Sequence, residues 1–438
     1  MRLLHSRTYE LREFIENETN KVEYAILSHT WDLDEVVFQD VQSWMVRYTR
    51  KLGWKKIDYC CRQARQDGID WTWMDTVCID KSSSAELSEA INSMFRWYRD
   101  AKVCYAYLAD IPAARWSARD HYSCLKDSRW FSRGWTLQEL LAPKRMILYG
   151  TDWNQLGTRH ELSDLISQVS GIQVSVLQGH ENEIGKFSIA QRMCWASRRE
   201  VTRSEDIAYC LLGLFDVNMP LLYGEGSKKA FIRLQEEIMK NSDDHTLFAW
   251  DVPEGVGRSK GAIKEVGLLA EHPIFFRSSK DVLSFRRWDV SDTFSMTNKG
   301  LRITIPLTAD VDSPENWIAY LDCHQLKGDQ RCAVGIPLQQ LSQGGDQFAR
   351  VAQATLDIPL SLEHEVTAEK RAIYIRKEII KPDDGFKGDT HRLREFRLLQ
   401  TPLTHRLVEK YGSARKGSNS QKLLAPPKTT SYWIDPLA

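Results

Sequence analysis

The sequence predicts an α/β protein, with a parallel sheet and its helices followed by a helical segment and a C-terminal antiparallel β-sandwich. Between residues 21 and 150, short β-rich runs alternate with helical periodicity, which is typical of parallel strands joined by crossover helices. Strand signals nearly vanish over 158–250 and return after about residue 258. A chain of 438 residues is also too long for one ordinary core, which favours two or three domains.

The first domain is expected over residues 1–157, with strands at 22–28, 71–79, 103–108 and 145–149. Apolar residues at helical spacing predict the first crossover helix, which Gly68 ends. Ser83 and Glu86 match a capping box that opens a second helix. A short third helix is expected from about Phe131 to Leu141, where Pro143 stops it.

A helical annex is expected over residues 158–257, packed on the first domain because its apolar faces need a partner. One of its helices should follow a capping box formed by Thr202 and Glu205. Gly224 and Gly226 fit a turn that opens the last helix, since the spacing of a phosphate-binding loop is absent.

The last parts of the chain are a predicted β-sandwich over 258–411 and a loose tail over 412–438. The sandwich is predicted from short β-branched or alternating runs separated by turns. These runs lie at 301–306, 317–321, 332–336, 348–352 and 373–377.

Composition excludes several classes of protein. Lys plus Arg and Asp plus Glu are equal at 59 each, so no basic field exists to attract nucleic acid. No apolar segment is long enough for a transmembrane helix, and the N-terminus lacks the apolar stretch of a signal peptide, so we expect a cytoplasmic protein. The nine Cys are scattered without zinc spacing, which predicts reduced, mostly buried thiols and no metal site.

Five segments taken together resemble the fungal heterokaryon incompatibility (HET) family. The resemblance covers roughly residues 1–250 and implies an effector of self/non-self recognition and regulated cell death. The segments are 24–31 (YAILSHTW), 73–81 (WMDTVCIDK), 95–101 (FRWYRDA), 130–140 (WFSRGWTLQEL) and 218–226 (NMPLLYGEG).

HET domains in turn remotely resemble Toll/interleukin-receptor (TIR) domains, which implies a TIR/flavodoxin-like sheet. The run from Trp135 to Leu140 (WTLQEL) is similar to a helix of plant-type TIR domains, with Thr136 in place of Cys. The Glu of that helix is associated with NAD cleavage, so the resemblance implies that Glu139 is catalytic, with NAD as substrate and no cofactor. It also implies control by homo-oligomerisation and an unknown activating protein.

A single carboxylate suits this chemistry. Cleavage of the nicotinamide–ribose bond passes through an oxocarbenium-like sugar, which a nearby carboxylate stabilises. Trp135 precedes Glu139 by four residues, so its indole could pack against the ring or ribose. The alternative is that Glu139 is a solvated helix residue or pairs with Arg133 or Lys144.

Further candidate binding residues follow the strands. Ser28, His29 and Trp31 fall at the carboxyl end of the first strand, where open α/β sheets bind ligands. Ser28 could bind ribose or phosphate and Trp31 could stack on a base, whereas a lone His29 is more often structural. Asp75 is a weaker candidate that could instead make a turn. Arg133 could bind a phosphate or be a solvated surface residue. Asp80 is expected to be structural.

Two classes of function fit these patterns. The first is an enzyme, an NAD+ glycohydrolase or cyclase. The second is a non-enzymatic adaptor in which the same Trp-rich surfaces make homotypic contacts. A weaker third hypothesis is that the sandwich binds sugar or peptide and acts as the sensor.

Overall fold

The computed structural model describes most of the chain up to residue 378. The described ranges are 1–15, 21–42, 51–117, 120–179, 184–253, 265–285, 293–309, 315–352, 355–359, 368–378, 397–401 and 404–408. Residues 1–379 form one unit and 380–438 another. The predicted tail and the predicted boundary near residue 258 lie outside the described residues.

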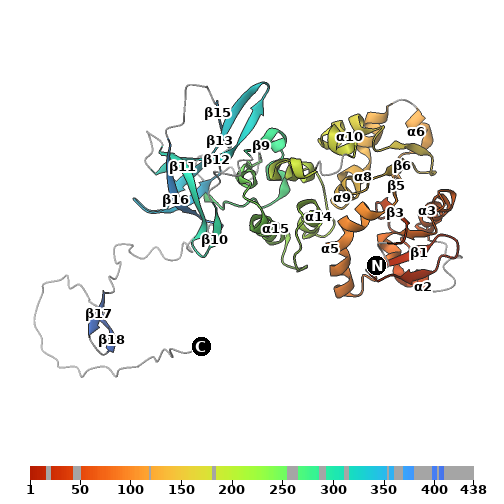
Figure 1. Cartoon of the computed structure of the whole chain (residues 1–438), viewed down its shortest axis with the longest axis horizontal. Coiled ribbons are helices and arrows are strands. Elements are labelled where there is room, and N and C mark those ends of the chain that lie inside the picture. The colour runs from red at the N-terminus through yellow and green to blue at the C-terminus, as the bar shows by residue number, and fades with distance from the viewer. Residues whose placement is uncertain are drawn as a thin grey trace, which may run out of the picture. The chain divides into compact units, whose positions relative to one another are not determined.

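A seven-stranded mixed sheet carries the first domain (Figure 1). Its order is β2-β1-β4-β3-β5-β6-β7, and the four central strands are parallel, as the alternating pattern predicted. Antiparallel strands that the sequence did not predict extend both edges. The strands are β1 (Arg2–His5), β2 (Leu11–Glu13), β3 (Tyr24–His29), β4 (Trp71–Trp73), β5 (Val103–Tyr107), β6 (Met146–Tyr149) and β7 (Gln155–Thr158).

Strand β3 lies at the point where the order of the parallel strands reverses. The chain passes from β3 to β4 on one side and then to β5 on the other. All six residues of β3 are buried, as expected for a parallel strand that is covered on both faces. Open α/β sheets bind ligands beyond the carboxyl ends of the strands at such a reversal. Ser28 and His29 occupy that end of β3.

The helices of the first domain depart from the prediction in two places. Residues 71–79 do not form the single strand that was predicted, because β4 ends at Trp73 and Asp75 begins the short helix α4. The prediction was wrong because a short apolar run does not distinguish a buried strand from a helix. The helix predicted at 131–141 is divided into α8 and α9 around Gly134. The helices are α2 (Phe38–Gln42), α3 (Trp54–Gln66), α4 (Asp75–Cys78), α5 (Ser84–Asp100), α6 (Ala113–Ser117), α7 (His121–Asp127), α8 (Arg129–Ser132) and α9 (Thr136–Leu141).

The predicted caps have mixed outcomes. The Ser83 side chain accepts the Glu86 N–H and caps α5 as predicted. The capping box at Thr202 is wrong, because the Glu205 carboxylate instead accepts the N–H groups of Gly224 and Gly226. Those glycines have φ of +102° and +82° and form the predicted turn before α15. The annex helices are α10 (Ser163–Ser170), α11 (Val174–Leu177), α12 (Ile189–Ala196), α13 (Asp206–Tyr209), α14 (Leu212–Phe215) and α15 (Ser227–Asn241).

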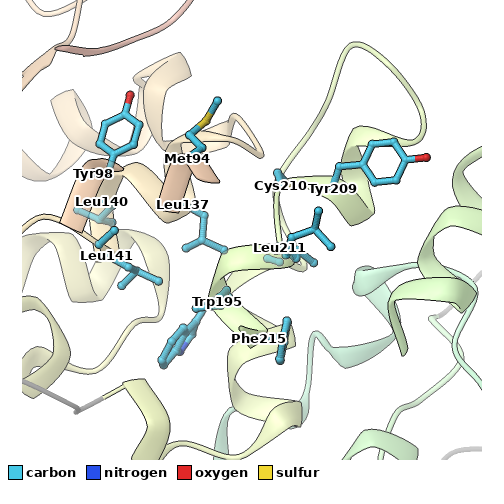
Figure 2. Close-up of a cluster of buried hydrophobic side chains, with 14 of the residues drawn as sticks. Met94, Tyr98, Leu137, Leu140, Leu141, Trp195, Tyr209, Cys210, Leu211 and Phe215 are labelled. Carbon is cyan, nitrogen blue, oxygen red and sulfur yellow. The ribbon is translucent and has the colours of Figure 1, made fainter. Parts of the chain in front are cut away.

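The annex shares a buried core with the first domain. Figure 2 shows apolar side chains of α5 and α9 gathered with side chains of α12, α13 and α14. Gly213 in α14 lies so close to α5 that a Cβ there would be 2.1 Å from the Phe95 Cβ. Helix α9 is therefore covered by annex residues as well as by its own domain.

The C-terminal strands form one sheet rather than the predicted sandwich of two sheets. Five of these strands are neighbours in the sheet in the order β11-β16-β14-β13-β12. The last of them, β12, also pairs with the first, β11, so the five strands close a ring. The pairing of β14 with β16 is parallel and the others are antiparallel. The strands are β8 (Glu265–Val266), β9 (Val282–Ser284), β10 (Ser295–Thr297), β11 (Gly300–Ala309), β12 (Asn316–Lys327), β13 (Gln330–Gln340), β14 (Gln347–Val351), β15 (Leu356–Pro359) and β16 (Glu369–Ile375). Beyond residue 379, β17 (Arg397–Thr401) and β18 (Thr404–Val408) form a hairpin.

A buried arginine connects this sheet to the annex. The Arg350 guanidinium donates to the carbonyls of Phe248, at 2.7 Å, and Trp250, and lies 3.5 Å from the Trp250 ring centroid. Arg350 is fully buried, so its charge is satisfied by carbonyl dipoles and an aromatic face.

Candidate functional site

The centre of the site is a hydrogen bond between a residue of strand β3 and a residue of the short helix α9. Ser28 Oγ donates to Glu139 Oε2 at 2.5 Å, and the Trp130 indole N–H donates to Ser28 Oγ at 2.8 Å. All three side chains are buried, and every residue of α9 is buried. The structure thus brings together the two predicted residues Ser28 and Glu139, which are 111 positions apart in the chain.

Glu139 is an acid whose surroundings favour its neutral form. Burial raises the pKa of Glu139 to about 8, and the nearby charge of Asp75 acts in the same direction. The hydrogen bond from Ser28, the nearby Tyr98 hydroxyl and the charge of Arg199 oppose the rise without cancelling it. At neutral pH most molecules therefore carry Glu139 protonated, because its pKa lies above 7.

Asp75 has the opposite character. Burial alone would raise its pKa, but the Lys81 ammonium, with hydrogen bonds from Lys81 and Trp31, leaves the pKa of Asp75 below its ordinary value. Its Oδ1 lies 3.7 Å from Nε2 of His29. The site therefore contains one ionised and one neutral carboxyl group, a division of states that enzymes use for acid–base work.

His29 is buried next to Asp75 as a neutral ring. Burial and the positive charge of Lys56 lower the pKa of His29 to about 3. Among the described residues, its Nε2 has no hydrogen-bond partner, because the 3.7 Å separation from Asp75 is too long. His29 therefore carries no charge in the physiological range.

Trp31 marks the solvent side of the site. Its side chain is 48% exposed, and its indole N–H donates to Asp75 Oδ2 at 2.9 Å. Lys81 Nζ lies 3.5 Å from the Trp31 ring centroid and 3.1 Å from the same Asp75 oxygen. One face of the predicted stacking residue is therefore covered by a cation.

Arg133 and Trp135 contact the annex rather than the Ser28–Glu139 pair. The Arg133 guanidinium donates to Thr202 Oγ1 at 2.6 Å, and the Trp135 indole N–H donates to Asp206 Oδ2 at 3.0 Å. Gly134, between them, donates its N–H to Glu200 O. A Cβ on Gly134 would lie 2.6 Å from Val201, so the close approach requires glycine. Asp80 accepts the N–H and hydroxyl of Ser82 and makes a turn, as expected.

Several residues of the site were missed by the sequence analysis. Trp130 and Lys81 stand inside the HET-like segments, where only their neighbours were given roles. Arg199 was given no role at the site, but it is buried and donates to Arg133 O at 2.7 Å and Thr136 Oγ1 at 2.9 Å. A buried ion pair of Lys56 with Glu35 carries no sequence signal, since both types are usually exposed.

A cavity of about 580 Å³ lies at the other end of the parallel strands, where these strands begin. Its basic lining residues are Lys21, Arg96, Arg99, Lys102 and Lys144, and Glu23 and Asp100 are acidic. It is separate from the carboxyl end of β3 and does not include Glu139. Over the described residues, no group of three or more His, Cys, Asp or Glu side chains is arranged to hold a metal ion.

Comparison with known families finds a likeness for part of the domain that carries this site. A family model described as Heterokaryon incompatibility protein (HET) matches residues 24–115. Residues 24–115 are therefore similar to the HET domain. The matched part of the HET domain includes Ser28, His29, Trp31 and Asp75, whereas Glu139 lies beyond it.

Another family model and one curated protein also match parts of the chain. A domain of unknown function (DUF8212) matches residues 229–307, from α15 into β11. The Vegetative incompatibility protein HET-E-1 of Podospora anserina is 47% identical over 223 residues, which are 50% of this chain and 16% of that protein. The chain thus spans about a sixth of this relative, and no solved structure matches it. In the described part of the chain, no helix is both long and apolar enough to cross a membrane.

Proposed function

We propose that this protein is an effector of heterokaryon incompatibility, acting through regulated cell death by cleavage of NAD-type dinucleotides. The observation that carries the proposal is the 2.5 Å hydrogen bond between Ser28 and Glu139 at the carboxyl end of the central strand. A further support is the order of the parallel strands, second-first-third-fourth along the chain, which is the order with which flavodoxin-like sheets begin. The name of the relative HET-E-1 supports the incompatibility role.

In this mechanism Glu139 is the charge-stabilising carboxylate. Its burial makes the ionised form unfavourable in the free protein, and a cationic substrate beside it lowers that penalty as positive charge develops on the ribose. Ser28 holds the carboxylate in place, and Trp130 fixes the Ser28 hydroxyl by donating to it. We assign Arg133 and Trp135 to fixing α9 against the annex.

The non-enzymatic adaptor is the second candidate, and the burial of Glu139 favours it. The side chain is 7% exposed and already hydrogen-bonded, as a structural core acid would be. In that case the exposed Trp31 would serve a homotypic contact between HET domains. The TIR resemblance makes assembly into homo-oligomers part of both candidates.

Nicotinamide release from NAD+ separates the two candidates. We expect the full chain, concentrated to promote assembly, to release nicotinamide, and the Glu139→Gln variant to release none. The Gln side chain has the same shape and can still accept the Ser28 hydrogen bond, so the variant is a matched control for folding. Equal inertness of both proteins across a wide concentration range would favour the adaptor.

A further inference from the structure

The Trp31 indole and the Asp75 carboxylate together hold one cation. Lys81 Nζ sits 3.5 Å from the indole centroid and 3.1 Å from Asp75 Oδ2, the oxygen that also accepts the indole N–H. The Trp31 side chain is about half exposed, so the cluster borders solvent. An aromatic face beside a carboxylate is a combination that binds positively charged groups.

Lys81 reaches this position on a flexible side chain. Its ammonium is compact and strongly hydrated, and it stands on a flexible four-carbon stem that can return to water. The Lys81 side chain is 28% exposed, so its ammonium is partly dehydrated where it lies, and this burial lowers the pKa of Lys81. A flat aromatic cation would cover more of the indole face than an ammonium does and would lose less hydration.

The groups behind the carboxylate can adapt to such an exchange. The Nε2 atom of His29 is buried without a hydrogen-bond partner in the described structure and lies 3.7 Å from Asp75 Oδ1. When Lys81 leaves, a small movement of the carboxylate toward His29 would bring the two atoms within hydrogen-bond distance. The buried ring would then stabilise the carboxylate in the orientation that faces the new cation.

We propose that Trp31 and Asp75 form a subsite for a planar organic cation of the N-alkylpyridinium class, which Lys81 occupies until the ligand displaces it. The choice of ligand rests on the proposed function, because the oxidised nicotinamide ring is such a cation. The subsite therefore selects NAD+ over NADH, whose reduced ring carries no charge.

Binding of 1-methylnicotinamide, measured by calorimetry on the full chain, tests the subsite without requiring turnover. Uncharged nicotinamide, which has the same ring, is the matched control ligand. We expect Lys81→Met to bind the cation about tenfold more tightly than the wild type, as a competing cation–π contact is removed, and to leave nicotinamide binding unchanged. Lys81→Arg keeps a cation in place and should resemble the wild type.

The double variant Trp31→Leu with Lys81→Met should lose the tighter binding of 1-methylnicotinamide that Lys81→Met alone shows. An equal gain for nicotinamide, a gain that survives without Trp31, or no gain at all would overturn the subsite. Its failure is distinguishable from failure of the proposed function, since binding of 1-methylnicotinamide is measured without any turnover of NAD+. If the cation binds with this dependence on Lys81 and Trp31 but NAD+ is not cleaved, the subsite is supported and the hydrolase proposal is wrong. If NAD+ is cleaved but cation binding does not depend on Lys81 and Trp31, the hydrolase proposal is supported and the subsite is wrong.

Discussion

Replacing Glu139 by Gln should stabilise the folded protein at neutral pH. In the fold the pKa of Glu139 is about 8, against an ordinary value of 4.5. A group whose folded pKa is raised contributes its full stability below the unfolded pKa and loses it as the pH rises through the folded pKa. Between those two values the penalty grows by about 1.4 kcal/mol for each pH unit, to roughly 3 kcal/mol at pH 7 and about 5 kcal/mol above pH 8.

Urea unfolding of the wild type and the Glu139→Gln variant from pH 5 to pH 9 measures this penalty. Gln remains neutral throughout, so the variant should gain on the wild type as the pH rises and the difference should level off above pH 8. Glu89, an exposed residue of α5, supplies the control: Glu89→Gln should change the free energy of unfolding by less than about 0.5 kcal/mol at every pH. A difference between wild type and Glu139→Gln that does not vary with pH would refute the assignment of Glu139 as a buried neutral acid.

Other variants test the parts that hold the site. Glu205→Gln should have the opposite effect and destabilise the fold in urea unfolding at pH 7. Backbone hydrogen bonds from Gly224 and Gly226 hold the pKa of Glu205 at about 2. The ionised Glu205 side chain therefore stabilises the fold above pH 4.5, and this stabilisation is lost as the pH falls toward 2 and is absent from the variant. Arg199→Met should lower the free energy of unfolding by about 2 kcal/mol, since two hydrogen bonds from a charged donor to the start of α9 are lost. It should also raise the pH midpoint of any turnover, because the charge of Arg199 lowers the pKa of Glu139; an unmoved midpoint would contradict this coupling. Trp135→Phe should lower the free energy of unfolding by about 1 kcal/mol through the lost indole N–H and leave the KM for NAD+ unchanged, whereas a raised KM would return Trp135 to the substrate.

The parallel core of the first domain could be predicted from the sequence because its strands are predominantly apolar and alternate with amphipathic helices. Its carboxyl edge followed from that arrangement, and so did the position of Ser28. Its partner Glu139 could be named only through the TIR resemblance. Spacing within a six-residue helix does not show which strand the helix faces.

The remaining features depend on contacts between distant segments, which local patterns do not encode. Arg199 and Glu205 lie in a charged stretch that looks solvated, yet Arg199 is buried under α9 and Glu205 binds backbone N–H groups about 20 positions away. The ring of strands from β11 to β16 was predicted as a sandwich because alternation shows that a strand is half-buried without showing its partners. The strand β4 was predicted too long for a similar reason, since α4 continues the same apolar run.

The pH dependence of nicotinamide release from NAD+ tests the central claim most directly, that the Ser28–Glu139 pair is the reactive centre. For the concentrated wild-type protein, kcat/KM should rise with pH through a midpoint near 8, where Glu139 loses its proton in the free protein, and the Glu139→Gln variant should stay inactive throughout. Turnover that is independent of pH between 6 and 9, or that persists in the folded Gln variant, would contradict the account.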